Sequence, residues 1–202
     1  MPEIFQPIRA GALGEPASLR ANTGALHLRE VPHTGKILLR GDPADRAFMG
    51  AAGRALDLVL PTEPCTSSAR SGVTALWLGP DEWLLVTEPG EAGAVLAKLD
   101  AARDPATSLA VDKSDEQTVI EVSGSVTRDL LAKGTPLDMH PRGFAVAQVK
   151  RTLFGRIDVI MHLKSEDEAG AVVDLYCRRS FAAYLWAFLR RAGREYGIPA
   201  AA

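Results

Sequence analysis

The chain has 202 residues, of which 47% are hydrophobic, and its 23 basic and 25 acidic residues give a formal net charge of −2. This composition can support a buried core, and the charge balance argues against a nucleic-acid surface that neutralises phosphates. The two cysteines, Cys65 and Cys177, exclude a disulfide framework and a multi-cysteine metal site, and they favour a reducing cytoplasm. Since the start of the chain lacks a secretory pattern and no apolar run could cross a bilayer, we expect no membrane partner.

The first part of the chain predicts an irregular arm followed by an α/β unit. Residues 1–35 hold several prolines and glycines without a sustained period, so we expect an arm packed over the domain. Asp42 and Pro43 suit the cap and first turn of a helix, and a Gly/Pro/Asp cluster between two apolar runs predicts a β-hairpin. The predicted strand, helix, strand, hairpin, helix and strand lie at residues 36–40, 43–53, 56–60, 74–78 with 83–87, 91–102 and 108–111.

The second part of the chain repeats that order of elements. It predicts a strand, a helix, three strands and a final helix, at residues 118–122, 125–133, 145–151, 157–162, 171–177 and from 180 onward. Setting residues 39–41 beside 122–124 also brings 56–57 beside 137–138. The repeat predicts an α+β fold of two halves related by a pseudo-twofold axis, each with a mostly antiparallel sheet covered by helices on one face. The expected organisation is an arm, one duplicated domain with two halves, and a tail, at residues 1–35, 36–197 (halves 36–112 and 118–197) and 198–202.

Two segments of the second half are the most informative. In LAKGTPLDMHPRGF, residues 131–144, Pro136 ends a helix and predicts a strand directly after it. In RRSFAAYLWAFLRRAG, residues 178–193, Ser180 is placed to cap a helix. The apolar stripe of this helix is predicted at Phe181, Leu185, Phe188, Leu189 and Ala192, with Tyr184 and Trp186 off its centre.

The sequence lacks motifs that carry chemistry. A G-x-S-x-G elbow and a glycine-rich phosphate loop are both absent, and residues 123–125 are better interpreted as a helix cap than as a nucleophile. The four histidines are scattered, and His140 is the one retained because it adjoins Arg142. The charge runs at 112–116 and 166–168 are typical of solvated turns. We therefore predict no catalytic, cofactor-binding or metal-binding residue.

Arginine and aromatic residues gather around the final helix. Because these side chains are enriched at the centres of protein interfaces, they predict a surface that binds a partner. An ordinary soluble helix, with cations near its C-terminal end that complement its dipole, is the alternative. The predicted interface residues are Arg142, Arg178, Arg179, Tyr184 and Trp186. On this prediction, Trp186→Ala weakens association and leaves the isolated fold intact.

Three motifs in this order and spacing resemble a known family. They are LGPDEWLLV at residues 78–86, LAKGTPLDMHPRGF at 131–144 and RRSFAAYLW at 178–186. Together they are similar to the gamma subunit of heterotetrameric sarcosine oxidase, over roughly residues 35–197. The resemblance implies the fold of the folate-binding domain of the glycine-cleavage aminomethyltransferase, which agrees with the repeat.

The resemblance also implies a role in a complex. Such an oxidase demethylates sarcosine, or a related N-methyl amino acid, to glycine. FAD and FMN are then expected in the beta subunit, NAD and tetrahydrofolate in the alpha subunit and zinc in the delta subunit. This chain would be a small non-catalytic partner without a cofactor of its own, bound to the alpha, beta and delta subunits in the cytoplasm.

Two other functions are left open by the sequence. One is a stand-alone folate-binding or one-carbon-transfer protein, for which Asp138 or Asp57 could supply the buried carboxylate. The other is an oligomerising scaffold without an enzyme partner.

Overall fold

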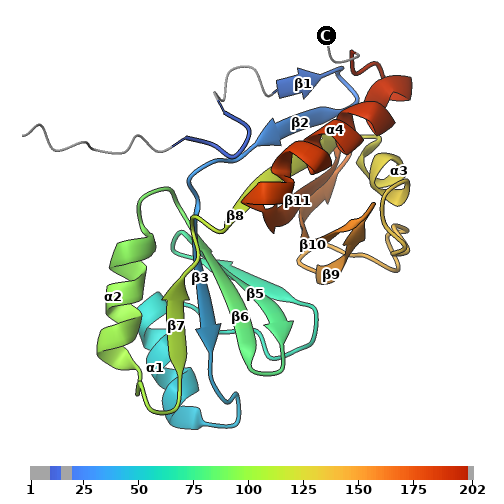
Figure 1. The fold of residues 1–202 in the computed structure, drawn as a ribbon. Helices are drawn as coiled ribbons and strands as arrows, with labels where there is room; N and C mark the ends of the chain where they lie inside the picture. The colour runs from blue at the N-terminus through green and yellow to red at the C-terminus, as the bar shows by residue number, and fades with distance from the viewer. Residues whose placement is uncertain (1–9, 15–19, 200–202) are drawn as a thin grey trace, which may run out of the picture.

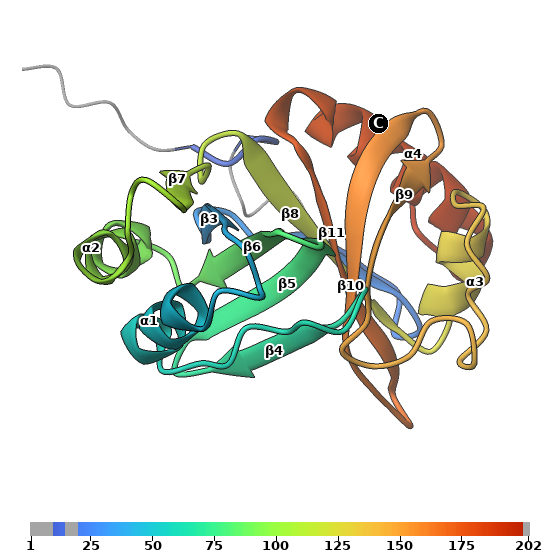
Figure 2. The same cartoon turned by 90° about the horizontal axis from the view of Figure 1, so that it is seen from below.

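Two antiparallel sheets pack face to face in the computed structural model, which describes residues 10–14 and 20–199 (Figure 1). Helices cover the outer face of each sheet, so the molecule has four layers, from α1 and α2 through the two sheets to α3 and α4 (Figure 2). Each layer boundary holds its own cluster of buried apolar side chains. This is the mixed α/β architecture with antiparallel sheets that the sequence predicts.

The five-stranded sheet belongs to the first half of the chain. Its strand order is β4-β5-β6-β3-β7, and α1 and α2 cover its outer face. The core between sheet and helices includes Ile37, Leu39, Trp83 and Leu85. The elements are β3 (Gly35–Arg40), α1 (Arg46–Leu56), β4 (Ser67–Arg70), β5 (Val73–Gly79), β6 (Glu82–Thr87), α2 (Ala92–Ala102) and β7 (Leu109–Asp112).

The six-stranded sheet draws on both ends of the described chain. Its strand order is β1-β2-β8-β11-β10-β9, and α3 and α4 cover its outer face. The elements are β1 (Arg20–Asn22), β2 (His27–Glu30), β8 (Gln117–Gly124), α3 (Thr127–Ala132), β9 (Val149–Phe154), β10 (Ile157–Asp167), β11 (Gly170–Arg178) and α4 (Ala182–Ala192), with 3₁₀ turns at Arg179–Phe181 and Gly193–Tyr196.

The inner faces of the sheets meet in a third apolar cluster. Leu76 and Leu84 come from the five-stranded sheet, and Val119, Ile160 and Tyr176 come from the six-stranded sheet. Central strands are therefore covered on both faces, which explains why β6 and β8 are apolar at adjacent positions instead of alternating.

The predicted internal duplication is present in the order and pairing of the strands. The order β4-β5-β6-β3-β7 corresponds element by element to β9-β10-β11-β8-β2, and every pair is antiparallel. Arg40 pairs with Leu109 at the start of β7, and Ser123 pairs with His27 at the start of β2. The alignment of residues 39–41 with 122–124 therefore matches the register of the folded chain.

The strands before β3 belong to the six-stranded sheet and not to the sheet that β3 enters. Strand β2 lies in the six-stranded sheet and leads into β3 of the five-stranded sheet, while β7 lies in the five-stranded sheet and leads into β8 of the six-stranded sheet. The prediction of an irregular arm is thus wrong for residues 20–30, which hold β1 and β2. Residues 1–9, 15–19 and 200–202 lie outside the described part of the chain.

Several predicted element boundaries are wrong in the first half. Asp45, not Asp42, caps α1, because its side chain accepts the N–H of Ala47, whereas Asp42 accepts the N–H of Ala44 one turn earlier. The strand predicted over residues 56–60 does not form. Asp57 closes the helix in the left-handed conformation with φ of 49°, and Leu58 and Leu60 after it pack against the core without a strand partner.

Boundaries in the second half also differ from the prediction. No strand follows Pro136, since residues 133–148 form a loop and β9 begins only at Val149. Helix α3 begins at Thr127 without a side-chain cap, so residues 123–125 do not cap it. Ser180 lies in the 3₁₀ turn before α4, whose N-terminal residue likewise lacks a side-chain cap.

Candidate functional site

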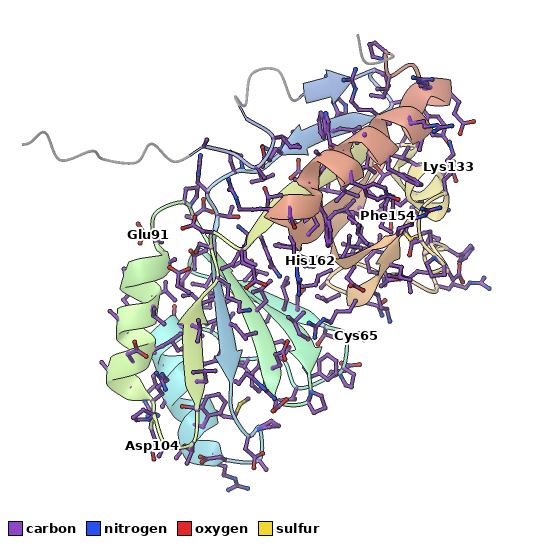
Figure 3. All side chains as sticks on the ribbon, viewed as in Figure 1. Cys65, Glu91, Asp104, Lys133, Phe154 and His162 are labelled. Carbon is purple, nitrogen blue, oxygen red and sulfur yellow. The ribbon has the colours of Figure 1, made fainter. Side chains whose placement is uncertain are left out.

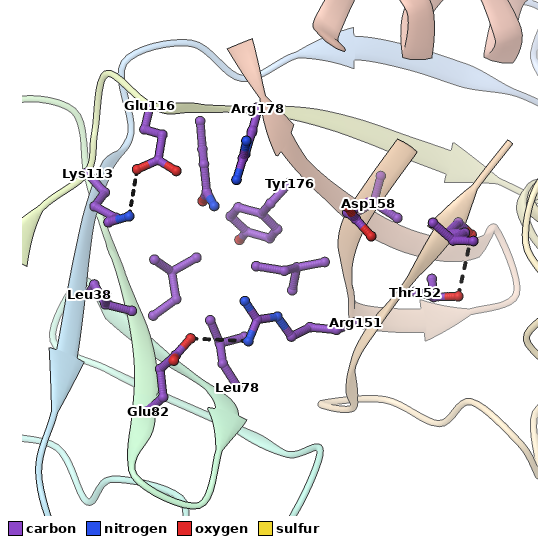
Figure 4. A pocket seen from close by; sticks show the side chains of 15 residues that line it. Leu38, Leu78, Glu82, Lys113, Glu116, Arg151, Thr152, Asp158, Tyr176 and Arg178 are labelled. Atoms are coloured by element: carbon purple, nitrogen blue, oxygen red, sulfur yellow. Dashed lines mark hydrogen bonds and ion pairs between the residues drawn. The ribbon is translucent and has the colours of Figure 1, made fainter. Parts of the chain in front are cut away.

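Two clefts open between the sheets, and Tyr176 lines both. The first, which we call the leucine cleft, has a volume of about 500 Å³ and an apolar floor of Leu38, Leu78 and Leu84. Figure 4 shows its rim of paired charges. Arg151 lies 3.2 Å from Glu82, Lys113 lies 2.7 Å from Glu116, and Arg178 stands nearby. The three leucines offer no group that donates or accepts a proton, and the charges at the rim are largely paired with one another.

The second cleft has a charged floor, and we call it the polar cleft. It has a volume of about 640 Å³ and is lined by His162, Lys164 and Asp174 from the six-stranded sheet, with Arg29 of β2 at its edge. Its opposite wall comes from β4, β5 and β6 of the five-stranded sheet. Figure 3 places His162 between the two sheets.

The two clefts occupy equivalent places in the duplicated fold. Leu84 pairs with Leu38 and Leu76 in the five-stranded sheet, just as Asp174 pairs with Glu121 and His162 in the six-stranded sheet. Both β5 and β10 carry a register shift, and it falls at Leu78 and at Lys164. The five polar residues Arg29, Glu121, His162, Lys164 and Asp174, named here the polar row, thus correspond to Val111, Leu38, Leu76, Leu78 and Leu84.

Glu121 is the centre of the charge network in the polar row. Its carboxylate accepts hydrogen bonds from Arg29 Nε at 2.6 Å, Arg29 Nη2 at 2.9 Å and Lys164 Nζ at 2.7 Å. Burial opposes ionisation of Glu121, but the hydrogen bonds from Arg29 and Lys164 outweigh it and lower its pKa. Glu121 therefore stays charged and fully engaged.

Asp174 is bound less well than Glu121. Lys164 Nζ lies 3.1 Å from its Oδ1 as an ion pair without hydrogen-bond alignment, and the Tyr176 hydroxyl lies 3.5 Å from its Oδ2. Burial raises the pKa of Asp174, and the neighbouring Lys164 only partly opposes this.

His162 is a neutral side chain with a defined tautomer. It is 5% exposed, and its Nε2 lies 2.9 Å from Ser67 Oγ, whose own proton is donated to Ala147 O at 2.9 Å. Nε2 must therefore donate, which leaves Nδ1 as a bare acceptor, and Nδ1 has no partner among the described residues. Burial and the positive Lys164 lower the pKa of His162 to about 4.

The residues predicted as a partner interface lie in two places. Arg142 is exposed in the loop between α3 and β9, while Arg178, Arg179 and Tyr184 surround the junction of β11 and α4. Arg179 donates to Ala10 O at 3.2 Å, which ties down the segment before β1. Tyr184 is 38% exposed, and its hydroxyl accepts the backbone N–H of Arg156. Their role as an interface stays a prediction.

Trp186 is not the exposed ring that the sequence analysis expected. It is 8% exposed and belongs to the core beneath α4. The buried face of the helix is rotated by about one position from the predicted stripe, because α4 begins only after the 3₁₀ turn. That face consists of Ala182, Leu185, Trp186 and Leu189.

The other residues singled out from the sequence lie away from the clefts. Asp138 and His140 are exposed and form a local turn, in which Asp138 accepts the N–H of His140 and His140 accepts the N–H of Arg142. Asp57 is exposed beside Arg70 and Ser71. Within the described ranges, no three His, Cys, Asp or Glu side chains group to hold a metal ion, and no helix there could cross a membrane.

Comparisons with known proteins agree on one family. The sarcosine oxidase, gamma subunit family matches residues 40–195. The chain is 32% identical over 150 residues to the sarcosine oxidase subunit gamma of an Arthrobacter species, which covers 74% of this chain and 72% of the relative. It is 33% identical over 142 residues to the subunit of Corynebacterium sp. strain U-96, which covers 70% and 68%.

Solved structures give the same answer for the fold. A chain of the heterotetrameric sarcosine oxidase from Corynebacterium sp. U-96, in complex with pyrrole 2-carboxylate, superposes with a TM-score of 0.82 at 28% identity, over 96% of this chain and 99% of that one. The aminomethyltransferase T of Bartonella henselae shares the fold, with a TM-score of 0.58 at 14% identity over 80% of this chain and 44% of that one. On these matches in sequence and fold, the chain belongs to the sarcosine oxidase gamma subunit family.

Proposed function

We propose that this chain is the gamma subunit of a heterotetrameric sarcosine oxidase and supports the demethylation of sarcosine without carrying the reaction itself. The main support is the structural match to nearly the full length of one chain of a solved heterotetramer. The alpha, beta and delta subunits are its proposed partners, and the cytoplasm is its proposed location.

The proposal assigns the cofactors to the partner subunits. We propose that FAD, FMN, NAD, zinc and tetrahydrofolate bind there, as the family resemblance implies. Support from this chain is that the charges in the two clefts are largely paired with one another and that the floor of the leucine cleft is apolar.

Purification of the tagged chain, alone and after co-expression with the three other subunits, tests this proposal. Alone, we expect a colourless protein without sarcosine-dependent oxygen consumption. After co-expression, we expect it to retain a flavin-coloured complex that oxidises sarcosine. Stable flavin absorbance in the isolated chain, or failure to retain any of the partners, would contradict the proposal. A panel of other N-methyl amino acids tests the substrate of the complex.

Tyr184→Ala is expected to weaken association with the partner subunits by about 2 kcal/mol, or roughly thirtyfold in Kd, as for a central interface aromatic. Its exposed ring and single backbone hydrogen bond predict little loss of stability in the isolated chain. Surface plasmon resonance against the remaining subunits measures the affinity. Phe181→Ala is a matched control, since Phe181 is 37% exposed at the start of the same helix but was not predicted to bind a partner. Equal effects of the two changes would contradict the predicted interface.

A stand-alone folate-binding protein is the second candidate, favoured by the fold shared with the aminomethyltransferase. Calorimetry with tetrahydrofolate on the isolated chain decides it. We expect no heat of binding at millimolar ligand, and saturable binding would establish this function instead.

A further inference from the structure

The fold does not require the polar row. Apolar residues occupy all five equivalent positions in the other half of the molecule, and three of them, Leu38, Leu78 and Leu84, line the leucine cleft. Buried ionic groups are often less stabilising than well-packed apolar residues of similar volume. Asp174 and His162 are only 7% and 5% exposed, so burying their polar groups opposes folding. The leucines at the equivalent positions of the other half avoid this cost. Polar residues at positions where apolar residues would serve the fold indicate that they bind a ligand.

Three residues of the polar row already satisfy one another's hydrogen-bonding groups. Glu121 holds Arg29 through two hydrogen bonds and Lys164 through a third, so its oxygens are used. Lys164 divides its charge between Glu121 and Asp174. These three residues satisfy one another through strong charge-assisted bonds, so Asp174 and His162 are the members of the polar row with unused acceptor capacity.

One buried acceptor in the cleft lacks a donor and another is only partly satisfied. Nδ1 of His162 has no hydrogen-bond partner in the described chain, whereas Oδ1 of Asp174 has only the ion pair with Lys164 Nζ at 3.1 Å. His162 and Asp174 stand directly opposite each other on β10 and β11, so their Cβ atoms are about 5 Å apart. Both line the polar cleft, and a buried acceptor without a full set of donors is unfavourable.

We propose that the polar cleft binds a small molecule with a primary or secondary ammonium group, whose N–H groups donate to Asp174 and to Nδ1 of His162. The site is separate from any chemistry assigned to the partner subunits, so the proposal does not depend on the proposed function.

The acceptors in the cleft select this class of ligand over others. A carboxylate or phosphate would bring more acceptors to a place where His162 Nδ1 has no donor and Asp174 is only partly satisfied. A metal ion would need a third ligand, and the described residues offer no group of three. An ammonium group supplies two or more donors and a charge that strengthens the bond to a carboxylate. The volume of about 640 Å³ lies in the range of small-molecule sites.

Titration of the ¹⁵N-labelled full chain with methylammonium chloride tests the proposal. Tetramethylammonium chloride is the matched probe, because it keeps the charge but has no N–H donor, and potassium chloride controls for ionic strength. We expect methylammonium to bind with a Kd of about 1–10 mM and to shift the Nδ1 resonance of His162, and tetramethylammonium to bind at least about tenfold more weakly. Equal shifts with both cations, or an unmoved Nδ1 resonance that leaves ordered water as the donor, would overturn the proposal.

Substitutions that copy the leucine cleft provide the second test. Asp174→Leu and His162→Leu each place in the polar cleft the residue found at the equivalent position, so we expect a thermal midpoint no lower than that of the parent. Each should weaken methylammonium binding at least about tenfold. Glu116→Gln, on the rim of the leucine cleft, is the control and should leave binding unchanged. Unchanged binding in both leucine variants would place the ligand elsewhere.

Discussion

Trp186→Ala is expected to lower the free energy of unfolding of the isolated chain by about 3–5 kcal/mol, as for other truncations of large buried aromatic residues. The indole is 8% exposed and packs in the core between α4 and the six-stranded sheet. Its removal leaves a cavity that the flanking Leu185 and Leu189, themselves fully buried, cannot fill without moving the helix. Urea denaturation followed by circular dichroism measures the loss.

Tyr184→Ala provides the comparison for this prediction, because Tyr184 lies two residues away on the same helix with 38% of its surface exposed. Its loss of stability should be under about 1 kcal/mol, in the range of a single hydrogen bond. If Trp186→Ala instead left the unfolding midpoint unchanged and only weakened partner binding, the burial of the indole described above would be wrong, and the ring would face the partner as the sequence suggested.

The contrast between Tyr184 and Trp186 shows what helical periodicity can and cannot decide. The pattern predicts a helix near residues 180–193, and α4 is there. The buried face, however, is rotated by about one position from the predicted stripe, and α4 begins only after the 3₁₀ turn at Arg179–Phe181. A rotation of this size moves a residue from the edge of the apolar stripe to its centre.

Local patterns predicted the elements that depend on neighbours in the chain. The hairpin of β5 and β6 is confirmed, and so are the helices α1, α2, α3 and α4, whereas the strand predicted at residues 56–60 is absent and β4 was not predicted. Strands β1 and β2 were missed because they have only three and four residues. In addition, β2 pairs with β8, about ninety residues away, and β1 pairs only with β2. Leu58 and Leu60 show the converse, since they are buried without a strand partner.

The polar row was missed for a related reason. His162 and Lys164 alternate with apolar residues along β10, a pattern that a single sequence assigns to a solvent-facing side. Only the second sheet, which is distant in sequence, turns that side into a buried cleft. The repeat contained a usable signal, because extending the alignment of residues 39–41 with 122–124 along the paired strands sets leucines against Glu121, His162 and Asp174.

The buried, neutral state of His162 leads to an expected pH dependence of stability. In the unfolded chain the imidazole takes up a proton near pH 6.5, whereas in the folded chain its pKa is lowered to about 4. Between these values the unfolded state binds more protons, so the stability from neutral His162 is complete above pH 6.5 and is lost as the pH falls toward 4. Over this pH range, His162 alone lowers the free energy of unfolding by about 3 kcal/mol.

The difference between the parent chain and His162→Gln isolates this contribution, because other groups of the polar row titrate nearby. The raised pKa of Asp174 acts in the opposite direction, since stability from its protonated form is lost as the pH rises, while the lowered pKa of Glu121 adds a loss at more acidic pH. Both are present in parent and variant and largely cancel in the difference. Denaturant unfolding at half-unit steps from pH 7 to 4 measures the free energy of unfolding of both proteins. As the pH falls, this free energy should decline less steeply for His162→Gln than for the parent chain. Parallel curves for the two proteins would mean that His162 is protonated in the folded chain, with its charge balanced by Asp174 across the strand pair.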